Sequence, residues 1–91
     1  MNFSEALEKI KEGDRVSRQN WNGRGMFIFL VPGSQFSIEK GRPLGIYGDF
    51  EDGTLIDYCP HIDMFTADKK VVPWLASQTD LLAEDWQEGA S

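Results

Sequence analysis

The fold is decided by the stretch Met26-Phe27-Ile28-Phe29-Leu30-Val31, six consecutive apolar residues that end at Pro32-Gly33. A half-buried strand alternates apolar and polar residues, whereas a strand that is apolar throughout needs cover on both faces. The chain offers only two short helical patterns to supply that cover. We therefore expect a second copy of the chain to cover one face, which makes the protein a homo-oligomer; long loops folded over that face are the alternative.

Candidate strands lie on both sides of this stretch, separated by residues that favour turns. Asn22-Gly23 is a strong signal for a tight turn, and Arg24-Gly25 extends it. Residues 49–53 and 67–70 are typical of hairpin loops. The candidate strands are residues 15–18, 36–38, 44–47, 55–58, 61–65 and 71–74. Short strands joined by short turns predict an antiparallel sheet.

Helix signals lie at both ends of the chain. Asn2 and Glu5 have the spacing of a capping box, and Gly13 stands where a helix commonly stops. The apolar stripe between them has helical spacing and comprises Phe3, Ala6, Leu7 and Ile10. Cap-forming residues at 77–80 precede Leu81, Leu82 and Trp86, which predicts a short second helix. We expect residues 88–91 to fray.

These patterns together predict an α+β fold. An N-terminal helix packs on an antiparallel β-sheet, a short C-terminal helix follows, and residues 1–91 form a single domain. The length of 91 residues and the mass of 10.3 kDa fit one domain with a thin core.

Charge and composition exclude several classes of protein. Nine basic residues against fifteen acidic ones give a net charge of −6, which disfavours binding to duplex DNA. No apolar run approaches the roughly 20 residues that span a bilayer, and the N-terminus lacks the pattern of a signal peptide. The single cysteine, Cys59, favours a reducing compartment. We expect a cytoplasmic protein without a membrane partner.

The sequence offers no pattern of catalytic or metal-binding residues. His61 is the only histidine, and its neighbours Cys59 and Asp63 are too close in the chain for the usual pairing of a nucleophile with a base. A metal site needs more His and Cys ligands than this chain has. Asp49, Glu51 and Asp52 fit a calcium loop poorly, because the glycine and the final glutamate are misplaced. We expect no catalytic residue, metal or cofactor.

Aromatic and polar residues instead suggest a binding site for a small anion. Trp21 precedes a glycine turn at residues 22–25, where backbone N–H groups and Arg24 can meet a phosphate, and Arg18 is a further candidate. Trp74 precedes the polar run 77–80, which suits ribose hydroxyls and the edge of a base. The alternative is that both indoles belong to the core and residues 77–80 only cap a helix.

Five motifs resemble a family of small phage and prophage domains that was long catalogued as a domain of unknown function. The resemblance covers nearly the whole chain and is least specific over residues 41–54. The motifs are Trp21-Asn22-Gly23-Arg24-Gly25-Met26, Leu30-Val31-Pro32-Gly33-Ser34, Pro60-His61-Ile62-Asp63-Met64, Val72-Pro73-Trp74-Leu75-Ala76-Ser77-Gln78-Thr79-Asp80 and Ala83-Glu84-Asp85-Trp86.

Members of this family include Thoeris anti-defence proteins of phages, which act as sponges. They bind the cyclic ADP-ribose-type signal, glycocyclic ADP-ribose, that a bacterial TIR-domain enzyme makes, and they hold it uncleaved. Some relatives also hold cyclic oligonucleotide signals at a separate site. Family members form homotetramers with ligand sites at subunit contacts. The resemblance implies the same behaviour here, in the cytoplasm of an infected or lysogenic bacterial cell.

The resemblance and the residues together give a candidate ligand site. Trp21 and Trp74 are expected to stack on the base, the glycine turn with Arg24 to bind phosphate, and residues 77–80 to make polar contacts. The full set is Trp21, Asn22, Gly23, Arg24, Gly25, Met26, Trp74, Ser77, Gln78, Thr79 and Asp80. Two other functions remain open: a phage protein that covers the surface of a host protein, and an enzyme that degrades the signal.

Overall fold

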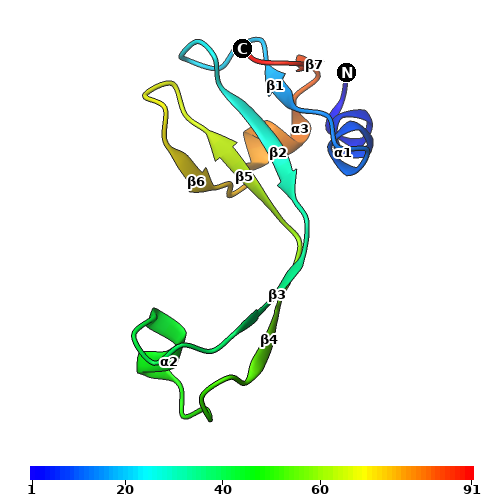
Figure 1. Ribbon diagram of the computed structural model, residues 1–91. Helices are drawn as coiled ribbons and strands as arrows, with labels where there is room; N and C mark the ends of the chain where they lie inside the picture. Colours follow the sequence, from blue (N-terminus) through cyan, green and yellow to red (C-terminus); the bar gives the residue numbers. More distant parts are fainter.

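The computed structural model describes residues 1–91 and consists of a body and an arm (Figure 1). We call residues 1–31 and 61–91 the body and residues 32–60 the arm. The body contains one antiparallel sheet with the strand order β6-β5-β2-β1-β7. Its strands are β1 (Val16–Arg18), β2 (Phe27–Val31), β5 (His61–Phe65), β6 (Val71–Pro73) and β7 (Trp86–Glu88). The central strand β2 is the apolar stretch that the sequence singles out.

Two helices of the body cover the same face of the sheet. Helix α1 (Phe3–Lys11) begins with the predicted capping box: Asn2 Oδ1 accepts from the Glu5 N–H at 3.0 Å, and Glu5 Oε1 accepts from the Asn2 N–H at 3.1 Å. Helix α3 (Gln78–Leu82) lies beside α1 (Figure 1). The core beneath them is small and comprises Ala6, Ile10, Val16, Ile28 and Trp86. No helix in the structure has the length and hydropathy needed to cross a membrane.

The opposite face of the sheet is apolar and has no helix on it. Ile28 points into the core, so its neighbours Phe27 and Phe29 point to the other face. Phe27 stacks on its cross-strand partner Phe65 with ring centroids 5.2 Å apart, and the Arg15 guanidinium lies 5.0 Å from the Phe27 ring. The prediction that β2 is apolar on both faces is therefore correct, and this chain covers only one of them.

The arm extends away from the body (Figure 1). It is a two-stranded antiparallel ribbon of β3 (Ser34–Ser37) and β4 (Leu55–Tyr58), with helix α2 (Pro43–Tyr47) between them. The arm gives the molecule extents of 47 × 26 × 21 Å and a radius of gyration of 16.3 Å. A compact chain of this length has a radius of gyration of about 12 Å. The arm therefore makes few of the contacts that a compact fold would provide.

Three sequence predictions about secondary structure are wrong. Residues 44–47 form helix α2 rather than a strand, because Pro43 favours the first turn of a helix and Gly45 packs against the Glu39 carbonyl. Trp86 lies in β7 rather than in the second helix, which ends at Ala83 with an extended backbone. The loop at 49–53 joins α2 to β4, whereas the turn at 67–70 connects β5 and β6 as predicted.

The sequence predicts that the C-terminal residues fray, but in the structure they are ordered. The Ser91 N–H donates to the Met26 carbonyl at 2.8 Å, and the Gly89 N–H donates to the Arg15 carbonyl at 2.9 Å. The segment therefore continues along β1 and packs on the loop between β1 and β2. These partners lie more than 60 residues away in the sequence, so local propensity did not indicate them.

The core on the covered face is so small that a single substitution in it should change the stability of the fold. Replacing Ile28 with alanine (Ile28→Ala) should lower the free energy of unfolding by about 2–5 kcal/mol, because it leaves a cavity beneath α1. Urea denaturation followed by tryptophan fluorescence measures this. The control Leu75→Ala removes a side chain that is 90% exposed and should change stability by less than about 0.5 kcal/mol. Equal effects of the two variants would contradict this account of the core.

Candidate functional site

Three tryptophans lie together where α1 and α3 meet the sheet. Trp86 is buried, and the half-buried Trp21 and Trp74 both pack edge-on against it, with centroid distances of 5.4 and 6.1 Å. Phe3 of α1 contacts Trp74 and Trp86 at 5.8 and 5.3 Å. The structure thus brings Trp21 and Trp74 together through Trp86. Each indole is part of the core and also exposes part of its surface.

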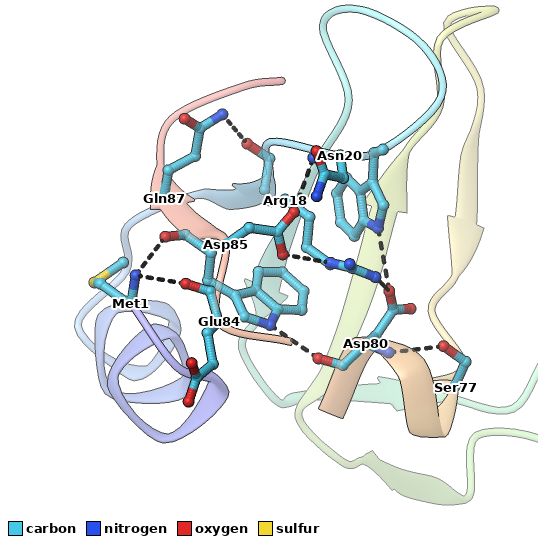
Figure 2. Close-up of polar contacts among 11 residues, drawn as sticks. Met1, Arg18, Asn20, Ser77, Asp80, Glu84, Asp85 and Gln87 are labelled. Carbon is cyan, nitrogen blue, oxygen red and sulfur yellow. Dashed lines mark hydrogen bonds and ion pairs between the residues drawn. The ribbon is translucent and has the colours of Figure 1, made fainter. Parts of the chain in front are cut away.

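Asp80 in α3 joins the helix to this cluster (Figure 2). Its Oδ1 accepts from Arg18 Nη1 at 2.9 Å and from the ring N–H of Trp21 at 3.2 Å. Its backbone carbonyl accepts from the ring N–H of Trp86 at 2.9 Å, and its backbone N–H donates to Ser77 Oγ at 3.0 Å. Asp80 therefore fixes two of the three indoles. This role is structural, whereas the sequence suggested a ligand contact.

Arg18 is held between two carboxylates (Figure 2). Its Nε donates to Asp85 Oδ1 at 2.8 Å, and its Nη1 pairs with Asp80. The hydrogen bond from Arg18 lowers the pKa of Asp85. Burial acts to raise the pKa of Asp80, but hydrogen bonds from Arg18 and Trp21 outweigh it and lower that pKa too. Because two carboxylates already pair with Arg18, it is poorly suited to bind a further anion.

The glycine turn is partly occupied by the C-terminal segment. The Gly25 N–H donates to the Ser91 carbonyl oxygen at 2.8 Å, and the Met26 N–H donates to Ser91 Oγ at 3.0 Å. Ser91 Oγ in turn donates to the Gly23 carbonyl at 2.9 Å. These two N–H groups are therefore not free to bind a phosphate in this structure. The Arg24 side chain is exposed and has no ion-pair partner.

A second turn carrying basic residues lies beside the glycine turn. Gly23 has a φ of +139°, and a Cβ there would lie 3.0 Å from the Cβ of Ala67, in the turn between β5 and β6. That turn carries Lys69 and Lys70, and Lys70 pairs with Asp68 at 3.3 Å. The two turns together place Arg24 and Lys69 at one end of the body.

The polar run at the start of α3 divides into two parts. Ser77 caps the helix and Asp80 holds the cluster of indoles, so both have structural roles. Gln78 and Thr79 are exposed and make no side-chain hydrogen bond. Asn22 is likewise exposed. Of the predicted polar contacts, Gln78, Thr79 and Asn22 remain available to a ligand.

Trp74 also lines a surface hollow of about 480 Å³, which the sequence did not indicate. The hollow lies where the arm joins the body, between the start of β5 and the edge strand β6. Its polar residues are His61 and Asp63, and the exposed Cys59 lies beside them. None of the other candidate ligand residues lines a hollow. No group of three or more His, Cys, Asp or Glu residues is placed to hold a metal ion.

The Arg18 pairing makes a prediction about stability. The substitution Arg18→Met leaves Asp80 and Asp85 without their partner and should lower the free energy of unfolding at neutral pH by about 1–3 kcal/mol. The exposed pair of Arg42 and Glu39 offers a control, since Arg42→Met should cost at most about 1 kcal/mol.

The same pairing predicts how stability depends on pH. Both carboxyls have a lower pKa in the folded chain, so their stabilisation is complete above the unfolded pKa of about 4 and is lost as the pH falls below it. Urea denaturation from about pH 5 to about pH 3 should show a steeper loss for the original chain than for Arg18→Met. Parallel losses in the two proteins would contradict the assignment.

Two comparisons with known proteins identify the family. A family model described as a Tad2-like, Thoeris anti-defense 2-like domain matches residues 1–88, which include the three tryptophans and all of α3. A Bacillus phage SP01 protein named "Thoeris anti-defense 2" is 41% identical over 87 residues, which cover 94% of this chain and 91% of that protein. This chain therefore belongs to the Thoeris anti-defense 2-like family of inhibitors of Thoeris defence.

Proposed function

We propose that this chain inhibits Thoeris defence as a sponge, by binding a cyclic ADP-ribose-type signal such as glycocyclic ADP-ribose and holding it uncleaved. The observation that carries the proposal is Trp74, a half-buried residue that lines a hollow of about 480 Å³. This volume lies within the range of small-molecule sites, which is about 300–1,000 Å³. Stacking of a base on an indole contributes about 1–3 kcal/mol.

The signal is an anion, and the free basic side chains support its binding to an acidic protein. Arg24 and Lys69 project from adjacent turns and form no ion pair, so a diphosphate would gain charge-assisted hydrogen bonds there. Gln78 and Thr79 have uncommitted polar groups that suit ribose hydroxyls.

The arrangement around the only histidine supports holding rather than cleavage. His61 Nδ1 lies 3.1 Å from the Cys59 carbonyl oxygen, so this ring nitrogen faces the backbone and not the thiol. A nucleophile needs a base within hydrogen-bonding reach of its reactive atom. This geometry does not activate Cys59.

We also propose that the chain works as a homo-oligomer, a tetramer by its resemblance to the family. The uncovered face with Phe27, Phe29 and Phe65 and the exposed apolar side chains of the arm support this assembly. In the arm, Ile46 is 61% exposed, Tyr47 87% and Leu55 61%. A two-stranded ribbon is marginally stable in water on its own, so it gains from a partner surface. We place the assembly in the cytoplasm of the bacterial host.

Two extensions of the proposal concern a second class of ligand and a protein partner. Cyclic oligonucleotide signals share the bases and phosphates of the proposed ligand and are a second ligand class by resemblance to the family. The exposed apolar arm also suits a host protein as partner, which would make the chain a protein-directed inhibitor. A stable complex with a host protein that added nucleotide does not disrupt would favour that alternative.

Binding and release test the sponge directly. Isothermal titration with glycocyclic ADP-ribose should show binding that Trp74→Ala weakens by about 1–3 kcal/mol, while Trp74→Phe retains part of it. The adjacent Leu75 is 90% exposed and lines no hollow, so Leu75→Ala should bind as the original chain does. Circular dichroism checks that each variant is folded.

The fate of the ligand separates a sponge from an enzyme. After incubation and heat denaturation of the protein, chromatography should recover the nucleotide intact and in full. Recovery of altered products would show cleavage and contradict the proposal. Absence of any nucleotide binding, together with capture of a host protein, would favour the protein-directed inhibitor.

The uncovered sheet face makes a prediction about assembly. Sedimentation equilibrium at micromolar concentration should give a multiple of 10.3 kDa, and Phe29→Lys should shift it toward the monomer. Asp63 is the cross-strand partner of Phe29, so the lysine meets a carboxylate and the fold should persist. The control Leu82→Lys changes an exposed residue of α3 and should leave assembly intact. A monomeric original chain would contradict the proposed oligomer.

A further inference from the structure

The uncovered face of the sheet carries opposite charges on the two sides of Phe29. Arg15 directly precedes β1, Phe29 lies in β2 and Asp63 lies in β5, and these strands are neighbours in the order β1-β2-β5. The register of β1 and β2 places Arg15 level with Phe29, and Asp63 is the cross-strand partner of Phe29. The Arg15 guanidinium lies 5.0 Å from the ring of Phe27, on the same face. Adjacent strands are about 4.8 Å apart, so a cation and a carboxylate each lie one strand away from Phe29.

Neither charge has a partner of opposite charge within a bonding distance in this chain. Arg15 forms no ion pair. The group nearest to the Asp63 carboxylate is the His61 ring, whose Nε2 lies 3.6 Å from Oδ2, too far for a hydrogen bond. The Asp63 side chain is 16% exposed, so a partner on this face would remove it from water altogether. A carboxylate buried without a cation destabilises a complex, and a partner must therefore bring a cation to Asp63.

A second copy of the chain brings that cation when the two faces meet in one particular way. Identical faces pack about a two-fold axis that lies in the plane between them. In the aligned packing of two sheets, this axis runs either along the strands or across them. An axis along β2 exchanges the two sides of Phe29, so that Arg15 of each copy faces Asp63 of the other. An axis across the strands places Arg15 opposite Arg15 and Asp63 opposite Asp63. The order of charges therefore favours the axis along β2.

The rest of the face suits this arrangement. Phe27 stacks on Phe65 and lies 5.7 Å from Phe29, so apolar rings fill the middle of the face and the charges flank them. An apolar centre with polar groups around it is typical of a specific protein interface. Pairing through the edge strand β6 is less favourable, because Pro73 has no N–H to donate to a further strand.

We propose that two copies of the chain pack these faces together about a two-fold axis along β2. Phe29 lies at the centre of the interface, and an ion pair between Arg15 of one copy and Asp63 of the other lies on each side of it. The proposal rests on the proposed homo-oligomer and adds the orientation of the copies and the residues that set it. The second copy is the favoured occupant of this face because its charges complement those of the first.

Reversal of each charge tests the pairing. Arg15→Glu and Asp63→Lys each place like charges opposite one another, so each should raise the dissociation constant of the assembly at least about 30-fold in sedimentation equilibrium. An equal mixture of the two variants should assemble again, because an interface between unlike copies then contains two pairs of opposite charge. Circular dichroism checks that each variant is folded.

Two controls make the same changes of charge elsewhere. Lys11 and Glu8 are exposed residues of α1, on the covered side of the sheet, and neither forms an ion pair. Lys11→Glu and Glu8→Lys should therefore assemble as the original chain does.

A cross-link detects the contact without reversal of a charge. Arg15→Lys keeps a cation and supplies an amine, which a carbodiimide joins to a nearby carboxyl group as an amide. Isotopically labelled and unlabelled copies of this variant are mixed before the reaction. Mass spectrometry should then find a labelled peptide joined to an unlabelled one, with the link between the lysine introduced at position 15 and Asp63. The further substitution Asp63→Asn should remove this link.

The outcomes separate this proposal from the oligomer on which it rests. A monomeric original chain contradicts both, and it leaves the face to a host protein. If the original chain assembles but the mixture of variants does not, or if either variant alone assembles as tightly as the original chain, the pairing is wrong while the oligomer stands. If a charge-reversal variant does not fold, the cross-link decides: links within single copies only, or no link at Asp63, overturn the proposal.

Discussion

Burial of the Trp86 indole beneath α1 is the contact on which the body of this protein depends. The ring packs against Ile10 and Ile28 in a core of five residues, and its N–H is bonded to the Asp80 carbonyl. The residue therefore connects β7, α3 and α1 in one place. Trp21 and Trp74 pack on its edges, so their positions follow from the position of Trp86. The candidate site is in this sense an extension of the core.

The fold was predictable where local patterns decide it. The capping box at Asn2 and Glu5 specified the start of α1, and the unbroken apolar stretch 26–31 specified a central strand that is apolar on both faces. Local sequence patterns did not predict the structure where contacts between residues far apart in the sequence determine it. Trp86 follows a helix and reads as its last apolar residue, but pairing with Arg18 of β1 places it in a strand. The C-terminal segment is ordered by the loop before β2.

The candidate site was predictable in composition and less so in geometry. The tryptophans and the polar run were correctly seen as neighbours, since both indoles and Asp80 meet around Trp86. The sequence could not show that Asp80 and Arg18 bind each other across 62 residues. It also gave no sign of the hollow, which exists only where the arm meets the edge of the sheet. The spacing of residues along the sequence indicates how one helix or strand is arranged, whereas this site is formed by residues from several elements.

In the proposed assembly, the position of the hollow would couple oligomerisation to ligand binding. Tyr58 belongs both to the arm, where it is 54% exposed, and to the wall of the hollow. A partner that covers the arm would therefore lie beside a ligand in the hollow, and it would close a hollow that one chain leaves open to solvent. Tight sites bury about 70–90% of a small ligand, which an open hollow does not achieve. By linkage, a ligand enclosed in this way stabilises the assembly as much as the assembly tightens the ligand. Such coupling would let a chain with a thin core reach both stability and affinity through the same contact.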